Sequence, residues 1–300
     1  MRLTLDVGGS KTRGFLYAES AVEQMEICGG FGKAEDYDEI ETTLFSALKE
    51  RLRDRCDKIT AVAVNLGGKN KGQILRTVAA VFPFAKISIN RESEGVLAKR
   101  IMRAHNANIL VMAGTGCIVF AESVQGSRVL GGWGKDYGDD GSGYSVGIKA
   151  VRYCLKDLDS GNEETSLLTQ ALFGVTKPFD FQQIDEYAAV RDEVRAHIPK
   201  TREGVAALTR VVVDCAEQGC ELSKRILQET GEELADLVLT AVRASKIDTP
   251  SVVINGGVTN FYAFWRDAFL YKLKKLGKEV PVVCLSDGID QALKQTVEEM

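Results

Sequence analysis

Near its N-terminus the chain reads Asp6-Val-Gly-Gly-Ser-Lys-Thr12, a glycine turn between two expected strands at 2–7 and 12–17. Successive glycines allow backbone N–H groups to converge on an anion such as a phosphate. The turn is not a P-loop, because Ser10 stands where that motif requires glycine and because a strand follows instead of a helix. The residues alone leave two interpretations, a phosphate-binding hairpin or an ordinary hairpin turn.

The same arrangement begins again in the second half of the chain. Met112-Ala-Gly-Thr-Gly-Cys117 joins two expected strands, at 108–113 and 117–122. A dinucleotide-binding fingerprint is excluded, because Val119 stands where that motif requires glycine and no helix follows. Each half therefore starts with a strand, a glycine turn and a returning strand, which predicts an internal architectural repeat.

Hydrophobic periodicity supplies the remaining elements. Further strands are expected at 22–28, 59–64, 85–89, 127–130, 251–255 and 280–285, and helices at 38–55, 93–104, 260–276 and 288–299. A largely helical stretch covers 143–244, with breaks near Ser160, Phe173 and Pro199. These elements predict an α/β protein of two domains, 1–107 and 108–286, with a last helix over 287–300 that returns to the first domain.

The composition narrows the class of protein. The chain has 29 glycines but only 5 prolines, which favours tight turns beside a ligand over flexible linkers. A net charge of −4 argues against nucleic-acid binding, and no apolar run is long enough to span a membrane. Seven scattered cysteines and two histidines favour a reduced, cytoplasmic protein without a zinc site.

Two more glycine clusters lie in the second half. Gly131-Gly-Trp-Gly134 is followed by Gly138-Asp-Asp-Gly-Ser142, which places two acidic residues before an expected helix. An acidic turn that caps this helix through Ser142 is the alternative interpretation. Asn255-Gly-Gly257 comes between a buried strand and a helix, where bare backbone allows a planar ring to lie close.

Taken together, the motifs resemble a known family. The resemblance rests on Asp6-x-Gly-Gly-Ser-Lys-Thr12, Ala113-Gly-Thr-Gly116, Gly131-Gly-Trp-Gly134, Gly138-Asp-Asp-Gly-Ser142 and Gly256-Gly257, which follow one another in order. This set is similar to the BadF/BadG/BcrA/BcrD-type ATPases, which include the N-acetylglucosamine and glucosamine kinases. The resemblance implies two ribonuclease-H-like domains of the actin–hexokinase ATPase type, with the nucleotide in a cleft between them.

The resemblance also implies ATP and Mg²⁺ as cofactors, a sugar or amino sugar as acceptor, and a homodimer. Asp6 and Asp139 would organise the magnesium ion and take part in catalysis. The nucleotide would be held by Gly8, Gly9, Ser10, Lys11, Thr12, Gly114, Thr115, Gly116, Gly256 and Gly257. The acceptor side would include Gly67, Gly68, Asn90, Arg91 and Gly134. Phosphoryl transfer chiefly requires such positioning and charge neutralisation.

The acceptor side departs from the family pattern. Sugar kinases of the family carry a catalytic Asp, the base toward the sugar hydroxyl, where this sequence has Arg91. Glu92 or Glu94 is the nearest replacement, although each is displaced along the chain. The sugar-binding asparagine of the family is absent from 28–33, and Ile118 replaces the polar residue after the second turn.

Three functions fit this combination of motifs. The first is a kinase of the N-acetylglucosamine kinase type with an altered acceptor. The second is an ATPase that activates a CoA-thioester dehydratase or reductase, although the iron–sulfur cysteine of such activators precedes the turn and Cys117 follows it. The third is a nucleotide-binding protein without turnover, in which Arg91 pairs with phosphate.

Overall fold

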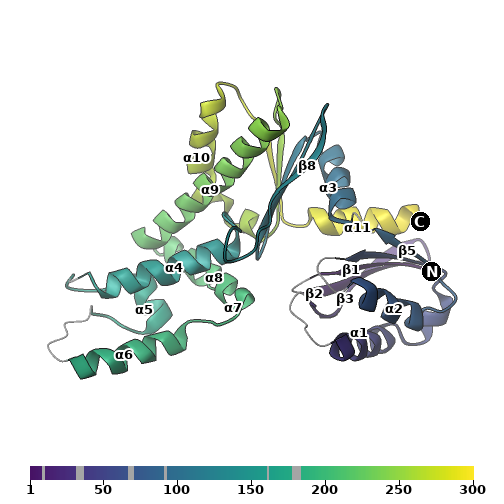
Figure 1. Cartoon of the computed structure of the whole chain (residues 1–300), viewed down its shortest axis with the longest axis horizontal. Helices are drawn as coiled ribbons and strands as arrows, with labels where there is room; N and C mark the ends of the chain where they lie inside the picture. Colours follow the sequence, from purple (N-terminus) through teal and green to yellow (C-terminus); the bar gives the residue numbers. More distant parts are fainter. Residues whose placement is uncertain (9–10, 32–36, 67–70, 91–92, 161, 178–183) are drawn as a thin grey trace. The chain divides into compact units, whose positions relative to one another are not determined.

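Two five-stranded sheets form the centre of this protein, one in each of two units (Figure 1). The computed structural model describes residues 1–300 except 9–10, 32–36, 67–70, 91–92, 161 and 178–183. The first unit contains Met1–Ile101 and Asp287–Met300, and the second contains Met102–Ser286. The last helix therefore belongs to the first unit, although it follows the second unit in sequence.

The first unit has the strand order β3-β2-β1-β4-β5. Its strands are β1 (Arg2–Val7), β2 (Lys11–Ala18), β3 (Ala21–Gly29), β4 (Ala61–Leu66) and β5 (Lys86–Asn90). Its helices are α1 (Tyr37–Leu52), the 3₁₀ helix η1 (Arg53–Lys58), α2 (Lys71–Val81), α3 (Ser93–Ala104) and α11 (Gly288–Glu299). The first three strands are antiparallel, and β1, β4 and β5 are parallel to one another.

The two faces of β1 have different neighbours, as the period of two in a strand requires. Leu3, Leu5 and Val7 are buried in a core shared with α1 and α2. The alternate residues Thr4 and Asp6 belong to the other face, which α11 covers (Figure 1). This alternation turns the carboxylate of Asp6 away from the hydrophobic core.

The second unit repeats this topology with the order β10-β9-β6-β7-β8. Its strands are β6 (Ile109–Ala113), β7 (Cys117–Ser123), β8 (Gly126–Gly131), β9 (Val252–Asn255) and β10 (Val282–Leu285). Its helices are α4 (Gly143–Leu158), α5 (Leu167–Phe173), α6 (Ile184–His197), α7 (Arg202–Ala207), α8 (Thr209–Glu217), α9 (Glu221–Ser245) and α10 (Tyr262–Leu273), with the 3₁₀ helices η2 (Gly257–Phe261) and η3 (Lys274–Leu276). The predicted α/β repeat is confirmed, because β6 to β10 occupy the places of β1 to β5.

The observed elements differ from the expected ones in a few places. The helix expected at 38–55 ends at Leu52, because Arg53 has a left-handed φ of 49° that an α-helix does not accommodate. The strand expected at 59–64 runs from Ala61 to Leu66. Helix α2 was not predicted. No helix among the described residues is both long enough and apolar enough to cross a membrane.

Candidate functional site

The glycine turn between β6 and β7 is fixed from both sides. The amide of Gly114 donates to the carbonyl oxygen of Gly116 at 2.9 Å. The carbonyl oxygens of Gly114 and Thr115 accept from the amides of Gly143 and Tyr144, at 2.8 and 3.2 Å, where α4 begins. Within the part of the chain that the structure describes, the amides of Thr115 and Gly116 donate to no other residue. The turn therefore presents two amide donors from a rigid support, as an anion site requires.

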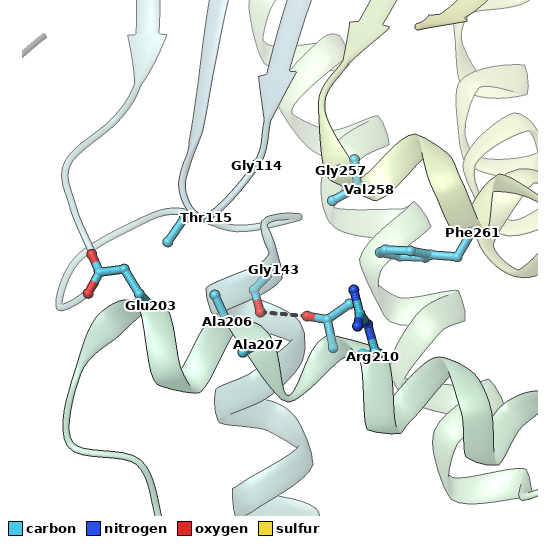
Figure 2. Close-up of a pocket in the computed structure, with 11 residues that line it drawn as sticks. Gly114, Thr115, Gly143, Glu203, Ala206, Ala207, Arg210, Gly257, Val258 and Phe261 are labelled. Atoms are coloured by element: carbon cyan, nitrogen blue, oxygen red, sulfur yellow. Dashed lines mark hydrogen bonds between the residues drawn. The ribbon is translucent and has the colours of Figure 1, made fainter. Parts of the chain in front are cut away.

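A pocket of about 630 Å³ opens beside this turn (Figure 2). Its lining comes from Gly114, Thr115, Gly143, Glu203, Ala206, Ala207, Thr209, Arg210, Gly257, Val258 and Phe261. Its size lies within the range of small-molecule sites. Three residues predicted to hold the nucleotide, Gly114, Thr115 and Gly257, meet on its walls although the last is far from the others in sequence.

The glycine pair after β9 forms one wall of the pocket. Gly256 has a φ of 123°, and a Cβ there would overlap the carbonyl oxygen of Ala113, so glycine is required. A Cβ at Gly257 would meet no atom within 4 Å, so this residue presents bare backbone to open space. The buried Trp265 supports the wall, because its Nε1 donates to the carbonyl oxygen of Val258 at 2.9 Å.

The remaining walls are apolar on one side and polar at the rim. Ala206 and Ala207 of α7 face the space below the turn, and the ring of Phe261 lies across from Thr115 (Figure 2). The side chain of the exposed Arg210 makes no hydrogen bond or ion pair with another described residue, which leaves its guanidinium available to a ligand. Sequence reasoning missed Phe261 and Arg210, because periodicity reads both simply as parts of helices.

Asp139 lies under the turn and not on the wall of the pocket. The residue is buried, and its backbone has a left-handed φ of 63°. One carboxylate oxygen accepts from the amide of Cys117 at 3.1 Å, and the other accepts from Nη2 of Arg202 at 2.5 Å. Burial raises the pKa of the Cys117 thiol far above its usual range, and the charge of Asp139 adds to this effect.

These contacts bear on the predicted magnesium role of Asp139. Mg²⁺ needs carboxylate oxygens that face its phosphate and water ligands, whereas both oxygens of Asp139 already have partners inside the protein. The metal-binding role stays a prediction, and the surroundings favour a structural one. The loop also caps α4, because Ser142 Oγ accepts from the amide of Ser145 at 3.1 Å. This is the capping that the alternative interpretation of the sequence expected.

In the first unit, polar residues form a row across the sheet. The strand register places Arg13 of β2, Asp6 of β1, Asn65 of β4 and Asn90 of β5 side by side. Nη2 of Arg13 donates to Asp6 at 2.8 Å, and Nη1 of Arg13 pairs with Asp290 of α11. Ligands in such sheets bind at the carboxyl ends of the parallel strands, where this row lies. Sequence reasoning found Asp6 and Asn90 but missed Arg13 and Asn65.

Of the other residues predicted for the site in the first unit, some make contacts within the sheet and others lie outside the described residues. The carbonyl oxygen of Lys11 accepts from the amide of Gly8 at 3.0 Å, which closes the first turn. The hydroxyl of Thr12 donates to the carbonyl oxygen of Gly29 at 3.0 Å, so it is directed into the sheet. Several predicted site residues lie outside the described part of the chain, namely Gly9, Ser10, Gly67, Gly68, Arg91 and Glu92, together with the side chains of Asn90 and Glu94.

In the second unit, Gly134 belongs to the loop between β8 and α4. Its carbonyl oxygen accepts from the amides of Tyr137 and Gly138, at 3.2 and 2.9 Å. The neighbouring Trp133 and Tyr137 are 77% and 87% exposed. The acceptor contact expected of Gly134 stays a prediction.

A repeated five-stranded sheet of this order is the fold of the sugar kinases of the actin-like ATPase class. The chain belongs to the BadF/BadG/BcrA/BcrD ATPase family, whose model matches residues 3–271. The resemblance seen in the glycine motifs is therefore confirmed.

Individual relatives agree with this assignment. The chain is 29% identical over 278 residues to an N-acetylmuramic acid/N-acetylglucosamine kinase of Clostridium acetobutylicum, with 88% of this chain and 87% of the relative covered. It is 31% identical over 143 residues to an N-acetyl-D-glucosamine kinase of Dictyostelium discoideum, with 47% and 42% covered. A proposed N-acetylglucosamine kinase from Porphyromonas gingivalis has the same fold, with a TM-score of 0.69, 18% identity and 98% of each chain covered.

Proposed function

We propose that this protein is an ATP-dependent kinase that phosphorylates an N-acetylated amino sugar. The observation that carries the proposal is the pocket in the second unit, where the amides of the Thr115 turn and the bare backbone of Gly257 meet around one space. The amides suit the phosphates, and the flat wall beside Phe261 suits the adenine ring. The similarity to the clostridial kinase over most of both chains supports the acceptor class.

The first unit supplies charge at the ends of its parallel strands. Mg²⁺ is usually held by one or two carboxylates together with phosphates and water, so the partly exposed Asp6 fits this role and the enclosed Asp139 does not. Bound Mg²⁺ neutralises phosphate charge during the transfer. Arg13 holds the carboxylate of Asp6 in position. We assign the base for the sugar hydroxyl to the segment after β5, at Glu92 or Glu94.

The two other functions considered from the sequence are less favoured. The relatives reported above are kinases of amino sugars and not activators of CoA-thioester enzymes. Cys117, the cysteine nearest the turn, is 4% exposed and burial raises the pKa of its thiol, which suits a core residue better than a cluster ligand. A sensor without turnover would share the nucleotide pocket, so only an activity assay separates it from a kinase.

The net charge and the cysteines also bear on the cellular setting of the protein. We propose a cytoplasmic homodimer that meets a small sugar and neither nucleic acid nor membrane. The net charge of −4 and the seven unpaired cysteines support the compartment and the lack of nucleic-acid binding. The dimer rests on the family resemblance alone, and sedimentation velocity would test it.

ADP release with Mg·ATP tests the proposed activity across N-acetylglucosamine, N-acetylmuramic acid, glucosamine and glucose. The kinase predicts release that depends on an N-acetylated sugar and saturates with it. Release at the same rate without any sugar would support the ATPase activator, and binding of ATP without release would support the sensor. Either outcome would contradict the proposed function.

A further inference from the structure

Arg202, the first residue of α7, lies directly against the glycine turn. A Cβ at Gly116 would overlap the guanidinium of Arg202 and would lie 2.8 Å from a carboxylate oxygen of Asp139. Only glycine therefore allows the arginine to approach the backbone of the turn this closely. Three later residues of α7, Glu203, Ala206 and Ala207, line the pocket. Arg202 itself does not line the pocket, but it lies against Gly116 of the turn that borders the pocket.

Asp139 fixes the position of the arginine. The ion pair joins Nη2 of Arg202 to a carboxylate whose side chain is only 2% exposed, whereas the arginine side chain is 30% exposed. A buried carboxylate without a cation would be strongly destabilising and would also repel phosphate. The guanidinium therefore neutralises Asp139, and part of the arginine side chain stays exposed.

Several of these donors have no partner inside the protein. A guanidinium carries five N–H donors, and the ion pair with Asp139 engages Nη2. The Nε atom of Arg202 is buried and makes no hydrogen bond within the described part of the chain. The amides of Thr115 and Gly116 beside it are likewise without partners there. The guanidinium lies next to the backbone of Gly116, and amide donors beside a guanidinium are groups that bind phosphate.

We propose that Arg202 binds the distal phosphates of ATP and that Asp139 is the positioning residue that holds it on Gly116. The proposal rests on the function proposed above, since it presumes a nucleotide in the pocket. The base and ribose occupy the space between Thr115 and Phe261, so the phosphates beyond the first reach the Gly116 end of the turn. Asp139 then contributes through the arginine and the turn, without a bond to magnesium.

Calorimetric binding of adenosine, AMP, ADP and ATP to Arg202→Ala tests the assignment. We expect ADP and ATP to bind ten- to a hundred-fold more weakly, which corresponds to about 1.4 to 2.8 kcal/mol. The affinity for adenosine, which has no phosphate, should change less than two-fold. Arg202→Lys should recover part of the loss, because it keeps the charge but not the fork of donors. Lys200→Ala, which removes an exposed charge two residues away, is the matched control and should change nothing.

Asp139→Asn tests the positioning role in the same series. The amide oxygen can still accept from Cys117, but the ion pair with Arg202 is lost. We expect a selective loss of ADP and ATP affinity that is smaller than in Arg202→Ala. A merely structural Asp139 would weaken adenosine as much as ATP.

The outcomes separate the two proposals. Equal weakening of adenosine and ATP in Arg202→Ala and Arg202→Lys, or unchanged ATP affinity in both, overturns the assignment of Arg202. Failure of the wild-type protein to bind ATP at all overturns the proposed function instead. If Arg202→Ala does not fold, Arg202→Lys and Gly116→Ala carry the test, because each should disturb the phosphate contact while adenosine binding remains.

Discussion

Gly257→Val is expected to fill the proposed nucleotide pocket while the fold stays intact. Gly257 lies on the pocket wall at the start of η2, and a Cβ there meets no protein atom within 4 Å. The added side chain therefore points into the space that the planar ring of the nucleotide would occupy. Its neighbour Gly256 offers no such test, because any side chain there would overlap the carbonyl oxygen of Ala113.

The magnitude follows from the cost of overpacking. Extra methyl groups in a filled space typically cost about 1 to 3 kcal/mol, which weakens ATP binding about 5- to 150-fold. The protein without ATP should keep its free energy of unfolding within about 0.5 kcal/mol, since the side chain meets open space. At an ATP concentration 100 times the wild-type Kd, the wild type gains about 2.7 kcal/mol, whereas a variant with a hundred-fold higher Kd gains about 0.4 kcal/mol.

Urea unfolding with and without ATP measures both quantities in one protein. Gly257→Ala should lose less of the stabilisation by ATP than Gly257→Val does, because it adds a single methyl group. Gly72→Val is the matched control, since its Cβ in α2 would meet nothing nearer than Nη1 of Arg76 at 4.0 Å. Full ATP stabilisation of Gly257→Val, with wild-type unfolding in the absence of ATP, would show that the nucleotide does not lie on this wall.

Three further changes test the surroundings of the site. Asp140→Asn should stabilise the protein slightly near neutral pH. Partial desolvation and then the Glu233 charge raise the pKa of this exposed carboxyl above 3.8, so wild-type stability falls as the pH rises from 3.8 through the raised pKa. Urea unfolding at pH 4 and pH 7 should show this loss in the wild type and a smaller loss in the variant. Gly147→Ala should lower the free energy of unfolding by about 1 to 3 kcal/mol and weaken ATP binding, since its Cβ would overlap the Val205 carbonyl and push α7 away from α4. Burial raises the pKa of Cys154 to about 12, so Ellman's reagent at pH 8 should leave this thiol unmodified until urea unfolds the protein.

The turn at Gly114 and the glycine pair at Gly256 could be located from the sequence because each depends on residues that are adjacent in the chain. The turn at Gly114 and the pair at Gly256 are local glycine patterns, and a period of two marks the strands on either side. The structure then places Thr115 and Gly257 on one pocket. The repeated sheet was equally predictable, since each half carries the same order of strands and turns.

The partner of Asp139 could not be predicted, because it comes from a separate helix 63 residues away. Periodicity shows that 143–244 is helical, but it does not show where the chain breaks into α7 and α8 or which arginines face the turn. Arg202 and Arg210 resemble any other surface arginine in the sequence. Their positions depend on the packing of α7 and α8 against α4, which local patterns do not encode.

Transfer of the γ-phosphoryl group from ATP to the sugar tests the central claim most directly. Mass spectrometry of the products from Mg·ATP and N-acetylglucosamine or N-acetylmuramic acid would follow both halves of the reaction. The kinase predicts one phosphorylated sugar for each ADP, with neither product formed when ATP or sugar is omitted. ADP accompanied by free phosphate, with the sugar recovered unmodified, would contradict the account.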